Sequence, residues 1–250
     1  MIGIAEFVTP HRYKQQSSCH LRISPQSMAR ELIQLPAAQL LQKFGSGGHK
    51  PGSGSAAALL GLIACKLIQT VVTLSANREL YKPVEPQLTL ANQDITSDIE
   101  PVLMTAVQED AECFDRVIAA RRLRDAETDK TKRRALAEKA LAELRTATEI
   151  PIAITEACLK LADKATLVFD LGFKAARGDS GVAISSALAG AQGSLSIIYL
   201  NLTSFKGSEW AIRTRVRADD LAIRVQSHQM QLLERISRLQ KEAIDRENAH

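Results

Sequence analysis

Hydrophobic residues recur at steps of three and four over most of this 250-residue chain, which is the spacing of one face of an α-helix. Residues 1–26 sustain no such periodicity, and we interpret them as a loose N-terminal tail. The remainder, 27–250, is predicted to form a single helical domain. Its helices are expected over residues 27–44, within a loop-and-helix stretch at 45–77, and over 85–121, 130–148, 151–176, 180–204 and 209–247.

Proline, glycine and short polar runs mark the predicted breaks between these helices. Pro36 should kink or split the first helix, and the polar run RLRDAETDK should end the long helix before it. A turn is predicted at residues 149–151, because the proline there is well placed at a helix start. Gly178 has the position of a helix-ending glycine, and Asp179 that of the N-cap of the next helix.

The stretch from Gly45 to Leu74, GSGGHKPGSGSAAALLGLIACKLIQTVVTL, joins a glycine-rich loop to an apolar helix. Such a loop leaves backbone N–H groups free at the helix start, and the helix dipole makes that end favourable for an anionic ligand. The helix carries one charge, Lys66, so we expect it to be buried on most faces as the centre of the bundle. A flexible linker is one alternative for the loop. A membrane span is an alternative for the helix, but its polar residues and the lack of a second span in the chain argue against it.

One acidic residue stands in a row of apolar residues on the helix predicted over 85–121. The row, at steps of four and three, consists of Ile95, Ile99, Leu103, Val107, Asp110, Phe114 and Val117. A carboxyl group in that row is partly removed from water, which raises its pKa and suits a proton donor or base near neutral pH. A buried Asp satisfied by a basic side chain or a helix cap would show the same spacing, so spacing alone leaves both interpretations open.

Composition narrows the class of protein. Hydrophobic residues make up 45% of the chain and aromatic residues 4%, which indicates an aliphatic, all-α core. The formal net charge of +4 arises from basic and acidic residues mixed along the helices, a pattern that argues against binding to nucleic acid. Four scattered cysteines and five histidines show neither disulfide nor metal-ligand spacing, and no signal-peptide core is present near the N-terminus. We therefore expect a cytoplasmic protein without a metal.

Two apolar helices in a chain of this size suggest a core shared with a second copy. The helix over 180–204 carries small residues at four-residue steps, which permit close approach by another helix or room for a flat ligand: Ser186, Gly190 and Ser194. The last helix has an apolar side made of Ile212, Val216, Leu221, Val225, Leu232, Ile236 and Leu239. We therefore expect a homodimer.

Five short motifs occur in order between about Leu32 and Lys206: PGSGSAAALLGLIA, EDAECFD, TEIPIAITEAC, GDSGVA and LNLTSFK. Together they resemble the motifs of the cyclodeaminase/cyclohydrolase family. That family includes the C-terminal domain of formiminotransferase-cyclodeaminase and stand-alone methenyltetrahydrofolate cyclohydrolases. The resemblance implies an all-helical homodimer that acts on a tetrahydrofolate derivative without a cofactor. It implies either loss of ammonia from the formimino compound with ring closure, or attack of water on the methenyl carbon with ring opening.

The resemblance also implies roles for particular residues. Asp110 matches the acidic residue of the family motif D-A-x-A-F and would be the general acid/base. The glycine loop would contact the ligand through Gly52, Ser53, Gly54 and Ser55. Asp179 and Asn201 would hydrogen-bond the pterin ring or hold the loop, and exposed basic residues near the mouth would bind the glutamate tail of the folate.

Four positions depart from the family pattern: Ser53, Lys66, Gly178 and Ile197. Ser53 adds a side chain where close approach is expected, and Ile197 removes a polar contact. These departures favour an alternative in which the chain keeps the fold without the reaction and serves as an interaction or scaffolding protein. The place of Asp110 in its apolar row favours the enzyme.

Overall fold

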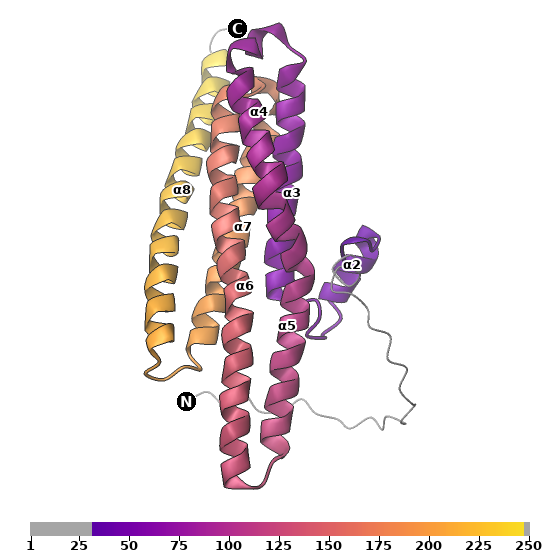
Figure 1. Ribbon diagram of the computed structural model, residues 1–250. Coiled ribbons are helices and arrows are strands. Elements are labelled where there is room, and N and C mark those ends of the chain that lie inside the picture. Colours follow the sequence, from indigo (N-terminus) through magenta and orange to yellow (C-terminus); the bar gives the residue numbers. More distant parts are fainter. Residues whose placement is uncertain (1–31, 248–250) are drawn as a thin grey trace.

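The protein is a bundle of long helices, seen in a computed structural model that describes residues 32–247 (Figure 1). The elements are α2 (Ala37–Phe44), α3 (Ser53–Ala76), η1 (Glu79–Val84), α4 (Glu85–Asp94), η2 (Ile95–Ile99), α5 (Glu100–Ala126), α6 (Lys130–Leu171), η3 (Lys174–Ala176), α7 (Arg177–Leu202) and α8 (Glu209–Glu247). All are helical, so the predicted all-α class is confirmed for the described range. The predicted tail and the first residues of the predicted helix over 27–44 lie outside that range. Pro36 is the N-cap of α2 and splits that predicted helix, as expected.

Helix α3 packs against α5, α6 and α7, and α6 packs in turn against α5 and α7. Its inner face is closely packed, with Cys65, Ile68 and Val71 completely buried. The outer face is open, because Ile63 is 45% exposed and Lys66 reaches the surface, where it pairs with Glu100. Burial on most faces is therefore not confirmed: α3 lies within the bundle but leaves one side accessible.

Two glycines let the backbones of α3 and its neighbours approach closely. A Cβ atom at Gly190 of α7 would lie 2.8 Å from the carbonyl oxygen of Ala57 in α3. A Cβ atom at Gly61 of α3 would lie 2.8 Å from Cδ1 of Leu103 in α5. Both distances are shorter than van der Waals contact. The small residues of α7 therefore serve, at Gly190, the helix packing that their spacing predicted.

Two helix boundaries differ from the prediction, and both lie close to a proline in a long helix. The helix expected over 85–121 is divided by the π-helical turn η2, directly before Pro101. Proline lacks an N–H and its ring crowds the preceding turn, so a wider turn relieves the contact. In contrast, the break predicted at residues 149–151 is absent, and α6 runs through Pro151 without interruption. Fully buried residues on both sides, Leu144 and Ile154, hold the helix against its neighbours despite the missing hydrogen bond.

The boundary between α6 and α7 also differs from the prediction. Helix α6 ends at Leu171, and its C-cap is Gly172, where a Cβ atom would lie 2.6 Å from the carbonyl oxygen of Val168. Gly178, expected to end this helix, lies instead in the first turn of α7 and has open space around it. Asp179 is therefore a first-turn residue and not the predicted N-cap. Gly172 was not among the predicted helix ends, and an added Cβ atom there would meet the carbonyl group of the last helical turn.

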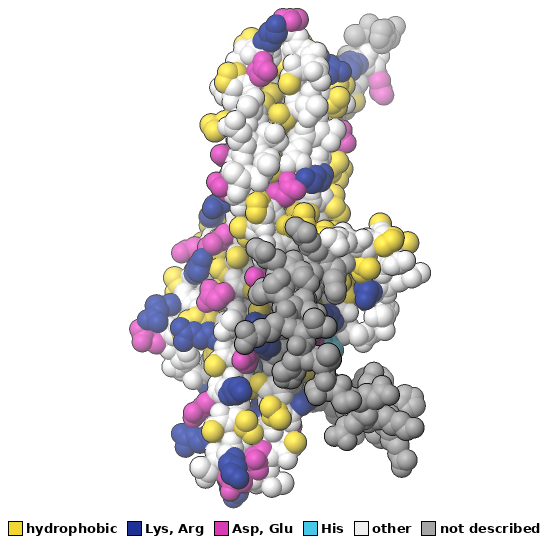
Figure 2. All heavy atoms as spheres, turned by 45° about the vertical axis from the view of Figure 1, so that its right-hand side comes forward, with side chains coloured by type: hydrophobic (Ala, Val, Ile, Leu, Met, Phe, Trp, Pro, Cys, Tyr) yellow, Lys and Arg dark blue, Asp and Glu magenta, His cyan; other side chains and the backbone are white. Residues whose placement is uncertain are grey.

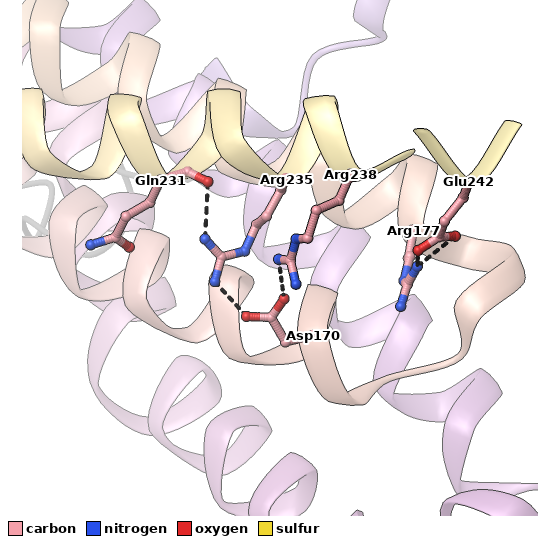
Figure 3. A network of polar contacts seen from close by, with 6 residues as sticks. All are labelled: Asp170, Arg177, Gln231, Arg235, Arg238 and Glu242. Atoms are coloured by element: carbon pink, nitrogen blue, oxygen red, sulfur yellow. Dashed lines mark hydrogen bonds and ion pairs between the residues drawn. The ribbon is translucent and has the colours of Figure 1, made fainter. Parts of the chain in front are cut away.

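Helix α8 lies along the outside of the bundle and contacts α6 and α7 (Figure 1). Only part of its predicted apolar side faces inward: Leu221 and Val225 are buried, whereas Ile212, Val216 and Ile236 are at least half exposed. Ion pairs attach its C-terminal half (Figure 3). Arg235 and Arg238 bind one carboxylate, Asp170 of α6, and Arg177 at the start of α7 pairs with Glu242 of α8 at 2.9 Å.

Two segments are long and apolar enough to cross a membrane by length and composition, namely Ser53–Ala76 and Lys174–Leu202. The expectation that the chain lacks a second such segment is therefore wrong for Lys174–Leu202. Half of the most apolar window of each is buried inside the structure. Figure 2 shows one face of the molecule, where basic and acidic side chains alternate over the lower half and form no patch of a single sign.

Candidate active site

A cavity of about 240 Å³ lies where the glycine loop meets α5, α6 and α7. Its walls are formed by His49, Gly52, Ser53, Asp110, Phe114, Ala147, Ile197, Leu200 and Asn201. Four of the seven residues predicted for the site line this cavity directly: Gly52, Ser53, Asp110 and Asn201. Elements far apart in the sequence therefore converge on one hollow, although the functional roles of these residues stay predictions.

The carboxyl group of Asp110 is seated on the N-terminus of α3. The backbone N–H of Ser55 donates a hydrogen bond to Asp110 Oδ2 at 2.9 Å, and the Ser55 hydroxyl lies 3.3 Å from the same oxygen. That hydroxyl also donates to the carbonyl oxygen of Val107 at 2.7 Å. Free N–H groups at a helix start were predicted to favour an anionic ligand. The structure places one of the protein's own carboxyl groups on them.

The environment of Asp110 raises its pKa above the ordinary value of 3.8. Burial is the largest cause, because it disfavours the charged form, while hydrogen bonds from Ser55 and from the backbone of Gly54 act in the opposite direction. The carboxyl group is thus held more readily in its acid form than an exposed Asp. This is the behaviour that the apolar row in the sequence predicted for it.

The glycines of the loop are required by the approach of this carboxyl group. A Cβ atom at Gly54 would lie 2.1 Å from Asp110 Oδ1 and 2.4 Å from its Cγ atom. A Cβ atom at Gly52 would lie 3.3 Å from Oδ2, a mild contact. The absence of a side chain at Gly54 therefore makes room for Asp110.

Polar groups from α6 and α7 face the opposite side of the site. The Asn201 side chain donates a hydrogen bond to the Thr148 hydroxyl at 3.2 Å. Pro151 has no N–H to offer the carbonyl group of Ala147, which is four residues earlier and lines the cavity. An uninterrupted helix with a proline at this position therefore presents a backbone acceptor without its usual helical donor.

Asp179, also predicted for the site, does not reach the cavity of its own chain. It lies in the first turn of α7, whereas Asn201 lies in the last turn, about 33 Å away by the helical rise. Two of the family departures also lie outside the cavity lining: Gly178 is next to Asp179, and Lys66 is on the exposed side of α3. Only Ser53 and Ile197 change the cavity wall.

Sequence reasoning missed His49, which lines the cavity beside Asp110. Its Nε2 atom lies 2.8 Å from Asp115 Oδ1, and Lys50 binds the other oxygen of the same carboxylate at 2.6 Å. The motif EDAECFD contains Asp115, and the glycine loop contains His49, but their contact spans 66 positions and has no local signal. Within residues 32–247, no three His, Cys, Asp or Glu side chains converge on a point where a metal ion would bind.

Comparison with known proteins identifies relatives of this chain. A sequence model of the formiminotransferase-cyclodeaminase family matches residues 36–220. A methenyltetrahydrofolate cyclohydrolase from Methylorubrum extorquens is 30% identical over 162 residues, which cover 64% of this chain and 76% of that protein. Among solved structures, the formiminotetrahydrofolate cyclodeaminase of Thermotoga maritima has a similar fold, with a TM-score of 0.73 at 16% identity. That match covers 84% of this chain and 99% of the other.

Proposed function

The chain belongs to the formiminotransferase-cyclodeaminase family, and we propose that it is a folate one-carbon enzyme that acts on a C–N bond of a tetrahydrofolate derivative. Of the two reactions expected in the family, hydrolysis of methenyltetrahydrofolate is favoured by the 30% identity to a cyclohydrolase. The observation that carries the proposal is the partly buried Asp110 carboxyl group, which is seated on the start of α3 and exposed to the cavity.

The chemistry requires proton transfers from the oxygen of the attacking water and to N5, the nitrogen that leaves the methenyl carbon. Water adds to the methenyl carbon and loses a proton, and N5 gains a proton as its bond to that carbon breaks. A carboxyl group with a raised pKa is suited to deliver that second proton, because its acid form persists nearer to neutral pH. Acid/base catalysis of this kind requires no cofactor, so we propose that the enzyme uses none.

The dimensions of the cavity suit part of a folate. Its volume of about 240 Å³ lies below the range of about 300–1,000 Å³ typical of cavities that enclose whole drug-sized ligands. We infer that the fused ring system enters and that the glutamate tail extends outward. Asn201 and the carbonyl group of Ala147 offer, respectively, a polar side chain and a hydrogen-bond acceptor for the edge of the ring.

Loss of the near-ultraviolet absorption of methenyltetrahydrofolate tests the proposal. The wild-type protein should accelerate this loss, and Asp110→Asn should reduce the rate to that of buffer. Asp125→Asn is the matched control, because Asp125 lies at the end of the same helix and is exposed to solvent. If wild type, control and Asp110→Asn all match buffer, and formiminotetrahydrofolate is also unchanged, the proposed function is wrong.

We also propose that the protein is a homodimer, joined through the outer faces of α3 and α7. The support is an open groove of about 500 Å³ between α3, α7 and α8, whose lining includes Leu60 and the small residues Gly181, Ser185 and Ala189. Val182, 55% exposed, lies beside them. Light scattering should give twice the chain mass of 27.3 kDa, and Ala189→Arg should return it to one chain. A single-chain mass for the wild type would contradict the homodimer. Cytoplasmic location stays a prediction.

A further inference from the structure

The glycine loop is fixed to α5 by one carboxylate that binds two consecutive loop residues. Asp115 accepts from Lys50 at 2.6 Å through one oxygen and contacts His49 Nε2 at 2.8 Å through the other. Burial alone would raise the pKa of Asp115, but the hydrogen bonds and charges of Lys50 and His49 outweigh it and lower that pKa. Asp115 is therefore anionic over a wider pH range than an isolated Asp.

His49 shares its cavity with Asp110. Both residues line it, and the imidazole ring lies with its centre 6.2 Å from that of Phe114, another lining residue. The bond to Asp115 uses Nε2, and within residues 32–247 no group forms a hydrogen bond with Nδ1. A carboxylate that accepts from one ring nitrogen leaves the lone pair on the other and stabilises the imidazolium when that nitrogen takes a proton.

The proposed reaction moves more protons than one carboxyl group can carry in a single step. The water oxygen forms a bond to the methenyl carbon, the C–N π electron pair moves onto nitrogen, and the first proton of the water leaves. The second proton leaves the new hydroxyl group as the carbonyl forms, while the C–N5 bond breaks, its electron pair goes to N5, and N5 takes a proton. One proton in total is released to solvent. A base and an acid on separate side chains satisfy this sequence when the base releases its first proton to solvent before it accepts the second.

We propose that His49, oriented by Asp115, is the second proton carrier of this site and accepts the protons of water at Nδ1 while Asp110 donates to N5. Of the two protons that His49 accepts in turn, one passes to solvent and the other restores the acid form of Asp110. This inference rests on the proposed function. It assigns Asp115 as a positioning residue that acts through His49, and Lys50 as the residue that keeps Asp115 charged.

A competing role for His49 is purely mechanical, as a link between the loop and α5. Two substitutions separate the roles. His49→Gln keeps an N–H donor for Asp115 but cannot accept a proton, and His49→Ala leaves space into which free imidazole can diffuse. For a proton carrier, His49→Gln should lower kcat by about 100-fold with little change in KM, in the range typical of lost acid/base catalysis. In His49→Ala, kcat should rise with imidazole concentration.

The controls keep this test distinct from that of the proposed function. Enzyme-free samples with the same imidazole are subtracted, Asp110→Asn should show no rise with imidazole, and Asp125→Asn should behave as wild type. Suppose that wild type is active and Asp110→Asn is not. Then a near-wild-type kcat in His49→Gln, or no rise of kcat with imidazole in His49→Ala, overturns the role of His49 and leaves the proposed function standing. An inactive wild type overturns both.

Discussion

Replacing Gly54 by alanine tests whether the seat of Asp110 on α3 is what makes the site work. The new Cβ atom would lie 2.1 Å from Asp110 Oδ1, whereas ordinary contact begins near 3.4 Å. The carboxyl group must therefore move by more than about 1 Å, since α3 is held by its packing and the Asp side chain can rotate. This displacement breaks the hydrogen bond from the Ser55 N–H to Asp110.

The expected cost falls on catalysis more than on stability. Loss of the hydrogen bond from Ser55 to a charged carboxylate lowers the free energy of unfolding by about 1.5–3 kcal/mol. Replacing a glycine by alanine within a helix raises it by about 0.5–1 kcal/mol. Movement of the Asp110 carboxyl group toward water offsets a further part of the lost stability, so we expect the free energy of unfolding to fall by less than about 2 kcal/mol. A catalytic group misplaced by about 1 Å can cost about 100-fold in rate, and kcat should fall by that order.

Gly178→Ala is the matched control, because Gly178 is also the second residue of its helix but has no neighbour within 4 Å of an added Cβ atom. Steady-state decay of methenyltetrahydrofolate and thermal unfolding followed by circular dichroism are measured for both variants. Gly178→Ala should retain wild-type kcat and unfold at the same or a higher temperature. In an Asp110→Asn background, Gly54→Ala should lower kcat no further. Wild-type kcat in Gly54→Ala alone would refute the reasoning.

Three further predictions concern stability. Because burial raises the pKa of Asp110, the folded state binds its proton more tightly than the unfolded state does. The stability that this group contributes is therefore present at low pH and is lost as pH rises from 3.8 through the raised value. Asp110→Asn should unfold at pH 7 at a temperature no lower than wild type, and its unfolding temperature should depend less on pH. Gly190→Ala should destabilise by about 1–2 kcal/mol in denaturant titration, because its Cβ would overlap the Ala57 backbone; unchanged stability would contradict that packing. Pro151→Ala should raise the free energy of unfolding by about 1 kcal/mol or more, because it gives the Ala147 carbonyl group its helical donor. The same change should raise KM, and an unchanged KM would exclude a role for that carbonyl group in binding.

The helical periodicity predicted most of the fold because each long helix buries one face against the bundle. Ile95, Ile99 and Leu103 are almost completely buried, as their spacing indicated. The failures occurred where local signals competed with packing. Pro151 is a strong local signal for a break, but the buried residues around it keep α6 continuous. On α8, spacing identified an apolar side without showing which of its residues the neighbouring helices cover, and Ile212 stays half exposed.

The site was predictable where a residue violates the pattern of its own helix. Asp110 interrupts an apolar row, and burial of a carboxyl group in such a row costs free energy, which marks the residue as a candidate for function. His49 violates no pattern, because a histidine in a polar glycine loop is unremarkable until α5 brings Asp115 beside it. Asp179 entered the prediction through a motif and not through geometry, and one helix length separates it from the cavity of its own chain.

The positions of the four departures weaken the case for a silent relative. Lys66 and Gly178 lie away from the cavity, so they change neither its shape nor its charge. Ser53 lines the cavity, but it is the first residue of α3, and the close approach to Asp110 is made at Gly54, which is retained. Ile197 alone removes a polar wall group, which alters what the site holds more than what Asp110 can do. A scaffolding protein has no need for a partly buried carboxyl group packed against a glycine at which a larger residue does not fit. The close contact of Gly54 with Asp110 therefore supports the enzyme over the silent relative.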